Sequence, residues 1–317
     1  MALRVAVQMD PLERINIAGD STFALMLKAQ ELGHELYWYA TEDLSWAEGR
    51  LWTMGCPVKV QRIEGSHYSF GEHRILDLGR DVDVVLMRQD PPFDLGYITA
   101  SHLLERIAGE TLVVNDPSAV RDAPEKLWVL DFPQFMPPTV ITRSLGLARK
   151  FLAEQGDIVI KPLHGFAGGS VFRVGSDGRN LASLMELFNR TYREPHVLQK
   201  FIPEIAQGDK RIVLIDGEVA GAVNRVPGEG EIRSNLAVGG KPAKTELTDR
   251  EKEICAALGP ELKARGLLFV GIDVIGGQWL TEINVTSPTG IVSIDELNGS
   301  DTPALFWKAV EAKLPAR

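Results

Sequence analysis

Residues 266–290, GLLFVGIDVIGGQWLTEINVTSPTG, contain two apolar runs separated by a pair of glycines. β-Branched and aromatic residues are frequent in both runs, and a Gly-Gly pair between such runs is typical of a tight turn. The segment therefore predicts an antiparallel hairpin with strands at 268–275 and 278–284. A two-residue turn at Gly276-Gly277 would join them.

Three oxygen-bearing side chains fall on one face of this predicted hairpin. With a two-residue turn, Asp273 lies opposite Leu280. Because side chains alternate along a strand, Glu282 and Asn284 then share the face of Asp273. Carboxylate and amide oxygens suit Mg²⁺, and carboxylates in an apolar setting need a charged partner. Two alternatives stay open: a solvated polar face, or a three-residue turn with a bulge that changes the register.

A glycine-rich loop follows a short apolar strand at residues 158–171, IVIKPLHGFAGGSV. Lys161 ends the strand, and Gly165, Gly168 and Gly169 lie in the loop. A lysine charge and exposed backbone N–H groups together suit a phosphate group. The spacing matches neither the nucleotide P-loop nor the Rossmann fingerprint. The alternative is an ordinary glycine-rich turn beside a lysine that reaches solvent.

Basic residues accompany these two features: Lys126, Lys161, Lys210, Arg211, Arg225 and Arg233. Lys210 and Arg211 open a predicted strand, from which side chains can reach a cleft between domains. Residues 226–240 are rich in glycine and resemble loops that close over reactants. The alternative for each basic residue is a simple surface charge. The six histidines and two cysteines form no nucleophile motif.

Strands and helices alternate over the first 120 residues. We expect strands at 4–8, 34–40, 82–87 and 111–115, and helices from Asp20 or Ser21 to Gly33 and at 97–108. This alternation predicts a mostly parallel sheet. Ligands of such sheets lie beyond the carboxyl ends of the strands, where the loops at Asp10 and Arg88 fall.

The pattern changes after about residue 120, and the turn at 116–118 is the expected domain boundary. We expect strands at 139–142, 157–161, 170–174, 197–202, 211–215 and 218–223, and helices at 147–155, 181–190 and 249–265. Asp216-Gly217 predicts a type I′ turn between two of these strands. This half of the chain is therefore expected to be α+β, with antiparallel pairing.

The composition excludes several classes of protein. The chain has 317 residues, 44% apolar and 24% charged, which excludes a disordered or low-complexity chain. No run approaches the ~20 apolar residues of a membrane span, and the N-terminus resembles a strand rather than a secretory signal. A net charge of −9 argues against general nucleic-acid binding, and two isolated cysteines favour a reducing cytoplasm. We expect neither nucleic acid nor a membrane as a partner.

Along nearly its whole length the chain resembles the bacterial glutathione synthetases, a family of ATP-grasp ligases. The motifs that carry the resemblance are Met9-Asp10-Pro11, LMRQDPPFD at 86–94, Glu125-Lys126-Leu127, Lys161-Pro162-Leu163, GDKR at 208–211, Asn235-Leu236-Ala237 with Gly239-Gly240, and TEINVTSPT at 281–289. The DPPFD and EINVTSPT stretches are specific to this family. The lysines, the glycine loop and Glu-x-Asn mark the wider superfamily.

The resemblance implies an α/β and α+β architecture, the ATP-grasp fold preceded by a preATP-grasp domain with a parallel sheet. The preATP-grasp domain would span 1–120 and the ATP-grasp unit 121–317. That unit would divide into a central glycine-loop subdomain, about 121–200, and a C-terminal metal and substrate subdomain, about 201–317. The family also implies a homo-oligomer.

The resemblance assigns roles to individual residues. ATP contacts fall on Lys126, Lys161, Gly165, Gly168, Gly169, Gln199, Lys200, Phe201, Ile202, Asp209 and Arg211. Asp273, Glu282 and Asn284 match the ligands of Mg²⁺, which Mn²⁺ can replace, and Arg225, Arg211 and Lys161 match catalytic residues. The candidate substrate residues are Asn16, Asp20, Arg88, Arg233, Ser287 and Thr289.

The implied reaction is the ATP-dependent ligation of glycine to γ-L-glutamyl-L-cysteine through an acyl phosphate. It yields glutathione, ADP and phosphate. The alternative is another ATP-grasp carboxylate–amine ligase, of the ribosomal-protein glutamate ligase or dipeptide ligase type. Two departures from the family pattern concern the mobility of the glycine loop: His164 stands where Asp is frequent, and Ala167 where Gly is usual.

Overall fold

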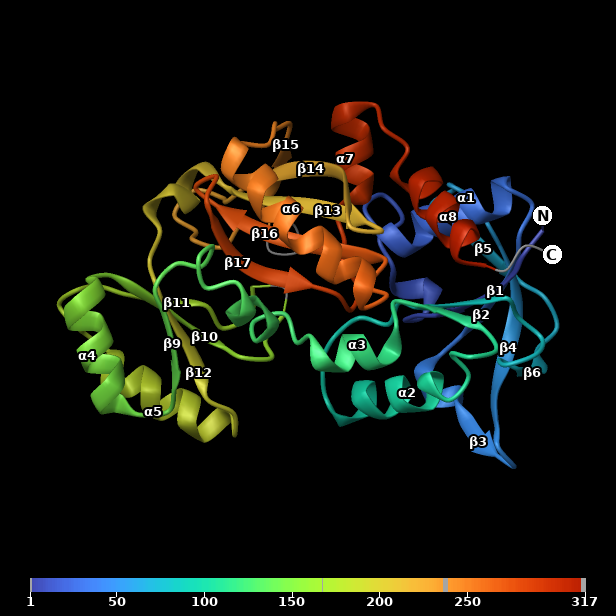
Figure 1. Ribbon diagram of the computed structural model, residues 1–317, viewed down its shortest axis with the longest axis horizontal. Helices are drawn as coiled ribbons and strands as arrows, with labels where there is room; N and C mark the ends of the chain where they lie inside the picture. Colours follow the sequence, from blue (N-terminus) through green and yellow to red (C-terminus); the bar gives the residue numbers. More distant parts are fainter. Residues whose placement is uncertain (1, 167, 236–238, 315–317) are drawn as a thin grey trace.

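The computed structural model describes residues 2–166, 168–235 and 239–314. Over these residues the chain forms three β-sheets, of eight, four and five strands, arranged along the long axis of the molecule (Figure 1). No helix among them is long and apolar enough to cross a membrane.

The eight-stranded sheet comes from the first 120 residues. Its strands are β1 (Arg4–Gln8), β2 (Glu35–Tyr39), β3 (Ser45–Ala47), β4 (Arg50–Val60), β5 (Tyr68–Phe70), β6 (Arg74–Asp77), β7 (Val84–Met87) and β8 (Leu112–Val114). The strands β2-β1-β7-β8 pair in parallel, as the sequence predicts. The antiparallel strands β3 to β6 extend this sheet and are not among the strands predicted from the sequence.

Helices cover both faces of this sheet. They are α1 (Ser21–Glu31), α2 (Leu95–Glu105) and α3 (Pro117–Asp122), with short 3₁₀ turns at Leu12–Arg14 and Thr41–Asp43. Asp20 caps α1, because its Oδ1 accepts a hydrogen bond from the backbone N–H of Phe23 at 2.6 Å. Alternate residues of β1 point to opposite faces: Val5 and Val7 join the core with α1, and Ala6 joins the core with α2.

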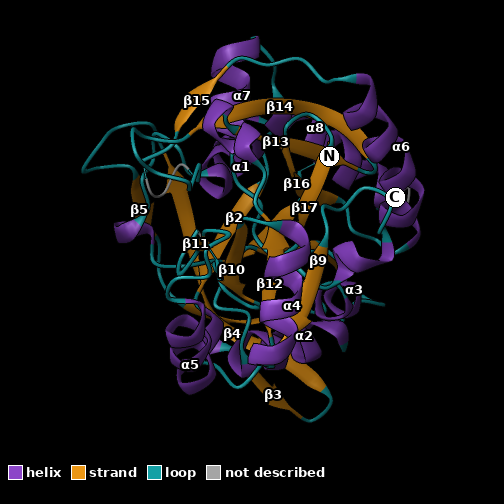
Figure 2. Cartoon of the chain, turned by 90° about the vertical axis from the view of Figure 1, so that its left-hand side faces the viewer, coloured by secondary structure: helices purple, strands orange, loops and turns teal. Residues whose placement is uncertain are grey.

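The four-stranded sheet is antiparallel throughout, in the order β11-β10-β12-β9. Its elements are β9 (Thr139–Thr142), α4 (Leu145–Gln155), β10 (Ile158–Pro162), β11 (Phe172–Val174), α5 (Leu181–Thr191) and β12 (His196–Lys200), after a 3₁₀ turn at Trp128–Asp131. Figure 2 turns this sheet toward the viewer, with α4 and α5 covering it. The buried face of β10 packs on these helices, so its carboxyl end carries Lys161 away from the core of this sheet.

The five-stranded sheet is also antiparallel, in the order β15-β14-β13-β16-β17. Its elements are a 3₁₀ turn (Pro203–Gln207), β13 (Asp209–Ile215), β14 (Glu218–Val226), β15 (Lys241–Ala243), α6 (Asp249–Ala264), β16 (Phe269–Ile275), β17 (Trp279–Asn284), α7 (Ile291–Asn298) and α8 (Thr302–Lys313). The type I′ prediction is confirmed: Ile215 pairs with Glu218, and both Asp216 (φ 47°) and Gly217 (φ 76°) have positive φ.

The C-terminal helix α8 returns to the N-terminal sheet. Trp307 is fully buried, and its Nε1 donates to the carbonyl of Leu25 in α1 at 2.8 Å. One apolar cluster contains Val5 of β1, Phe269 of β16 and Phe306 of α8. The two halves of the chain therefore share a core, which fixes the eight-stranded sheet against the five-stranded one.

Both cysteines are free and buried, Cys56 in β4 and Cys255 in α6. Burial raises the pKa of the Cys255 thiol to about 12, and Glu251 adds to this shift. At pH 8 only about one such thiol in ten thousand is ionised, so we expect no rapid reaction with a disulfide reagent in the folded protein. A titration with 5,5′-dithiobis(2-nitrobenzoate) should detect both thiols only after denaturation. A thiol that reacts in the folded protein at the rate of free cysteine would contradict this, and Cys56→Ser identifies which one.

Candidate active site

The hairpin of β16 and β17 frames the candidate site, and its register differs from the prediction. The turn has three residues, because Ile275 pairs with Trp279. A bulge at Thr281 then shifts the register again, so that Asp273 pairs with Glu282 rather than with Leu280. The hydroxyl of Thr281 donates to the carbonyl of Asp273 at 3.1 Å, which holds the bulge. Together the two shifts move the partner of Asp273 by two residues, from Leu280 to Glu282. Because side chains alternate along a strand, the predicted shared face is present although the predicted pairing is wrong.

A cavity of about 350 Å³ opens beside this hairpin, between the four-stranded and five-stranded sheets. Residues of β10, β12, β13, β14, β16 and β17 line it, together with loop residues 165, 166, 168 and 169 and the loop at 232–235. The residues predicted to be catalytic, ATP-binding or metal-binding all line this cavity: Lys126, Lys161, Gly165, Gly168, Gly169, Gln199, Lys200, Phe201, Ile202, Asp209, Arg211, Arg225, Asp273, Glu282 and Asn284.

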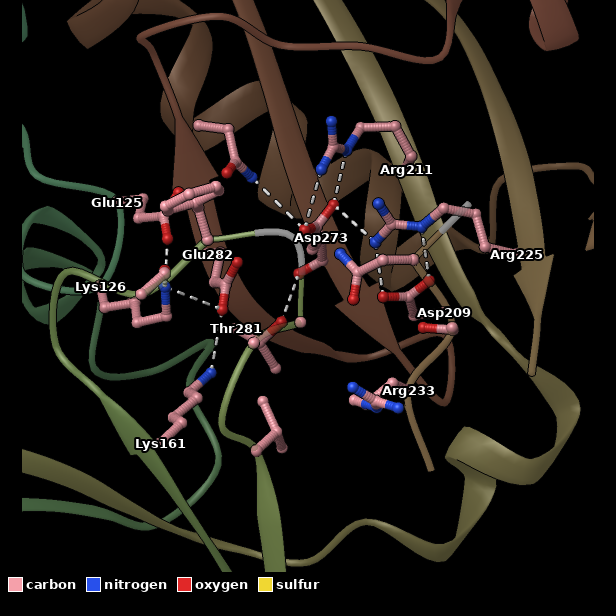
Figure 3. A pocket seen from close by; sticks show the side chains of 18 of the residues that line it. Glu125, Lys126, Lys161, Asp209, Arg211, Arg225, Arg233, Asp273, Thr281 and Glu282 are labelled. Atoms are coloured by element: carbon pink, nitrogen blue, oxygen red, sulfur yellow. Dashed lines mark hydrogen bonds and ion pairs between the residues drawn. The ribbon is translucent and has the colours of Figure 1, made fainter. Parts of the chain in front are cut away.

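Asp273 lies at the centre of the charged residues on one side of the cavity (Figure 3). Arg211 donates to it through Nε to Oδ1 at 2.6 Å and through Nη2 to Oδ2 at 3.1 Å. Nη2 of Arg225 lies 3.0 Å from Oδ1, and Nδ2 of Asn284 donates to Oδ2 at 3.3 Å. Burial raises the pKa of the Asp273 carboxyl, but the two guanidinium groups outweigh it and hold this pKa well below its usual range.

Arg225 also binds Asp209 with both arms of its guanidinium group. Nε donates to Oδ1 at 2.7 Å and Nη2 to Oδ2 at 2.5 Å. The two residues are direct cross-strand partners in β13 and β14, and both side chains are buried. Burial raises the pKa of Asp209, and Arg225 only partly opposes this shift. Such a bidentate pair fixes the plane of the guanidinium group next to Asp273.

Two lysines and two glutamates form a second charged cluster (Figure 3). Nζ of Lys161 lies 3.1 Å from Oε1 of Glu282, and Nζ of Lys126 lies 3.5 Å from the same atom. Lys126 also pairs with Glu125 and donates to the carbonyl of Gly165 at 2.5 Å. Burial raises the pKa of Glu282, but the lysines outweigh it and lower this pKa overall. The cations and carboxylates that line the cavity thus neutralise one another.

Apolar side chains supply the rest of the cavity wall, among them Val159, Val171, Ile202, Ile205, Ile232 and Ile275. Phe201 follows β12, and the guanidinium group of Arg173 stacks on its ring at 4.1 Å. An apolar wall with a few polar groups at one end is typical of a small-ligand site. The wall and the charged clusters together suit a molecule with a flat apolar part and several negative charges.

The glycine loop approaches the cavity closely, as its composition predicts. Gly168 has a φ of +73°, and a Cβ atom there would lie 2.7 Å from Oδ1 of Asn235. A larger residue would be strained and would also displace Asn235. His164 stacks against Phe93 with ring centroids 6.0 Å apart, whereas Ala167 lies outside the described residues.

The predicted substrate residues fall into two groups. Arg233, Ser287 and Thr289 line the cavity. Arg233 pairs with Glu231 at 2.5 Å and lowers the pKa of Glu231 to about 2.

The other predicted substrate residues do not line the cavity: Asn16, Asp20 and Arg88. Asn16 is exposed, and Asp20 caps α1. Arg88 is buried, with hydrogen bonds to Thr22 and to the carbonyl of Pro288.

Several cavity residues were not predicted as site residues. Glu125 is the most important, because burial raises its pKa and Lys126 pairs with it directly. Asp90 and Thr286 also line the cavity. Glu125 and Asp90 lie inside two of the motifs that carry the family resemblance, at 125–127 and 86–94. The neighbouring Arg88 is a candidate because of its loop position, and Lys126 because it matches a phosphate-contacting lysine of the family. The acids next to them carry neither signal.

The residues present fit a hard divalent cation. Asp273, Glu282 and Asn284 bring two carboxylates and a carboxamide to one sheet face, which is the donor chemistry of Mg²⁺ and Mn²⁺. Among the described residues no three His, Cys, Asp or Glu side chains are grouped as a metal site. A cation held here would therefore need further oxygen ligands, and phosphate groups in the cavity would supply them.

Comparisons with known proteins agree with this geometry. The family described as "Prokaryotic glutathione synthetase, N-terminal domain" matches residues 3–121, and "Prokaryotic glutathione synthetase, ATP-grasp domain" matches residues 125–299. Glutathione synthetases of Rhodopseudomonas palustris and Brucella melitensis are 56% and 52% identical to the chain. The alignments cover 99% of the chain and 99% and 100% of those proteins.

Solved structures show the same fold at lower identity. The ATP-grasp ligase PsnB, in a complex with a precursor variant, Mg and ADP, is 19% identical with a TM-score of 0.62. That match covers 98% of each chain, and at this identity it shows the fold alone. The matched domains and full-length relatives identify the chain as a member of the prokaryotic glutathione synthetase family, with the ATP-grasp fold of an ATP-dependent ligase.

Proposed function

We propose that this protein joins glycine to γ-glutamylcysteine in a reaction driven by ATP. The observation that carries the proposal is the cavity where Lys126, Lys161, Arg211 and Arg225 converge beside an apolar wall. The full-length relatives named glutathione synthetase supply the choice of substrates. In the first step the cysteinyl carboxylate attacks the γ-phosphorus of ATP, which releases ADP and forms an acyl phosphate. The amine of glycine then attacks the acyl carbon, and phosphate leaves.

The residues of the cavity divide this work between them. The segment Gln199–Ile202 and the apolar wall would hold adenine, and Asp209 would face the ribose. Lys126 and Lys161 would exchange Glu282 for phosphate oxygens, because their ammonium groups are already buried beside the cavity. Mg²⁺ or Mn²⁺, held by Asp273, Glu282 and Asn284, would neutralise charge on the phosphates. This assignment leaves no protein nucleophile in the reaction.

Arg211 and Arg225 are the residues we assign to the reacting groups. Their guanidinium groups are fixed in advance by Asp273 and Asp209, so little reorganisation is needed when negative charge develops on the substrate. Closure of the loop at 226–240 would keep water from the acyl phosphate. Residues 236–238 of this loop lie outside the described residues.

The remaining assignments rest on the family. We propose a boundary between the preATP-grasp domain and the ATP-grasp unit near residue 120, which agrees with the two matched ranges 3–121 and 125–299. We also propose a homo-oligomer, and a cytoplasmic location because the reaction consumes ATP.

A coupled assay of ADP release tests the proposed function. With ATP, Mg²⁺ and γ-glutamylcysteine, we expect rapid ADP release only after glycine is added, because glycine discharges the acyl phosphate. Glutathione should form in equal amount, measured by chromatography. ADP release of the same rate with glutamate or D-alanine as the acceptor, and none with glycine, would assign the protein to another ligase specificity.

A further inference from the structure

The loop at 286–290 lines the cavity but is fastened to the N-terminal sheet. Nη2 of Arg88 donates to the carbonyl of Pro288 at 3.0 Å, and the hydroxyl of Ser287 donates to the carbonyl of Arg88 at 3.3 Å. The N–H of Gly290 donates to Oγ of Ser21 at 3.1 Å. Three hydrogen bonds therefore fix this wall of the cavity to the end of β7 and the start of α1.

Arg88 is well fixed itself. It follows β7, its N–H donates to the carbonyl of Gln8 at 2.8 Å, and it is 5% exposed. Its Nε donates to Oγ1 of Thr22 at 3.0 Å, and its guanidinium group lies 5.2 Å from the ring centroid of Phe269. The guanidinium group thus uses two of its nitrogens in fixed directions, one toward α1 and one toward the loop. A lysine could not make both hydrogen bonds with the same geometry.

The loop connects Arg88 to Arg211. The carbonyl of Thr289, next to Pro288, accepts a hydrogen bond from Nη1 of Arg211 at 3.2 Å. The stem of Arg211 and the ring of Pro288 both pack over Gly271, where a Cβ atom would lie 3.0 and 3.1 Å from them. Consecutive carbonyl groups of the loop therefore bind the two arginines. A shift of the loop would remove one of the three hydrogen bonds that orient the guanidinium group of Arg211, and the two to Asp273 would remain.

We propose that Arg88 is a positioning residue, which holds the loop at 286–290 in place and, through the carbonyl of Thr289, orients Arg211 for the reaction. The role of Arg211 in this statement rests on the proposed function. Arg88 contacts no reacting atom in this scheme. Its loss should therefore affect turnover more than nucleotide affinity, because the residues to which we assign nucleotide binding, Lys126, Lys161 and Phe201, line the cavity outside this loop.

The variant Arg88→Lys tests the proposal while keeping the buried charge. We expect kcat to fall by about 10- to 100-fold, as for a small misplacement of a catalytic group, with ADP affinity within about threefold of wild type. In an Arg211→Lys background the same change should cost less than about threefold, because the effect of Arg88 passes through Arg211. Additive losses, or a wild-type kcat for Arg88→Lys, would overturn the proposal.

Amide hydrogen exchange supplies a readout that does not depend on activity. Arg88→Lys should increase exchange in a peptide covering 286–290 and leave β10 and β12 unchanged. Arg4→Lys is the matched control, because Arg4 donates to a backbone carbonyl, that of Arg80, at the opposite end of the same sheet. It should change neither exchange nor kcat. Unchanged exchange at 286–290 in Arg88→Lys contradicts the positioning role, whereas a wild-type protein inactive with γ-glutamylcysteine and glycine contradicts only the proposed function.

Discussion

Replacing Arg225 with alanine is expected to lower kcat by about 100- to 1,000-fold and to change ATP affinity by less than about tenfold. Arg225 is buried, and Asp209 and Asp273 hold its guanidinium group from two sides. Such a fixed donor stabilises charge that develops in the transition state without reorganisation. The contacts that we propose between ATP and the two lysines, Lys126 and Lys161, do not involve Arg225, so the affinity for ATP should change much less. The measurement is kcat in the ADP-release assay beside the Kd of ATP from calorimetry.

The same substitution should also destabilise the fold, and this effect must be separated from catalysis. Without Arg225, the carboxylate of Asp209 is buried with no guanidinium partner, and Asp273 keeps only Arg211. Breaking a buried ion pair in this way costs about 3–5 kcal/mol in the free energy of unfolding. Urea denaturation of Arg225→Ala should detect this loss.

The double variant Asp209→Asn/Arg225→Ala separates the two effects. It removes the buried charge that Arg225 compensates, so most of the free energy of unfolding should return. The value of kcat should stay low, because the donor to the substrate is still missing. Recovery of kcat together with stability would make Arg225 a structural residue, and equal losses of kcat and ATP affinity would also contradict the proposed role.

The pattern of the sequence predicted which elements form, because local signals determine them. The turn at Asp216-Gly217 and the cap at Asp20 each follow from residues close in sequence. The alternation of strands and helices predicted parallel pairing among β1, β2, β7 and β8, but not their order in the sheet. The strands β3 to β6 were missed. The sequence of β4 gives one reason, because it combines an exposed Met54 with a buried Thr53 and includes a proline. It therefore shows neither the regular alternation of apolar and polar residues nor the continuous apolar run by which strands are predicted.

The shared face of the hairpin was predicted correctly only because two errors in the predicted register cancelled each other. The two-residue turn was wrong, and so was the assumption of an unbroken ladder, but each error moved the register by one residue. Turn length and bulge depend on Gly276 and Gly277 in the left-handed region and on the hydrogen bond of Thr281 to Asp273. Such details are fixed by the packed structure and not by the pattern of apolar residues.

The pairing of charges in the site also required the tertiary structure. Lys161 and Glu282 are 121 residues apart, and Arg211 and Asp273 are 62 residues apart. The position of Arg88 after β7 was predicted, but its side chain turns toward α1 and the loop instead of the cavity. A residue at the end of a strand can point to either face, and only the docking of Pro288 selects one.

Replacing Glu282 with glutamine is expected to strengthen nucleotide binding without Mg²⁺ and to bring no gain in affinity when Mg²⁺ is present. Oε1 of Glu282 lies 3.1 Å from the ammonium nitrogen of Lys161 and 3.5 Å from that of Lys126, so metal-free nucleotide must compete with this carboxylate. Removing that charge releases Lys161 from its ion pair and leaves Lys126 with Glu125 as its only carboxylate partner among the described residues. Metal-free ADP should therefore bind about tenfold more tightly, as expected when one charged hydrogen bond no longer competes. With Mg²⁺ present the gain should vanish, because Glu282 is also a proposed metal ligand.

Turnover of Glu282→Gln should fall by at least about 100-fold, the upper value found for residues that merely support a metal ligand. Calorimetry with ADP in EDTA, and then in Mg²⁺, measures both effects without relying on activity. Glu125→Gln is the matched control, because Glu125 also pairs with Lys126 but is not a proposed metal ligand. It should strengthen metal-free binding of ADP to a smaller extent, and adding Mg²⁺ should raise ADP affinity by the same factor as in the wild type. If Mg²⁺ loses its effect on ADP affinity equally in both variants, Glu282 is not the residue that contacts the metal. If neither strengthens metal-free binding, the lysine–glutamate pairs do not compete with phosphate.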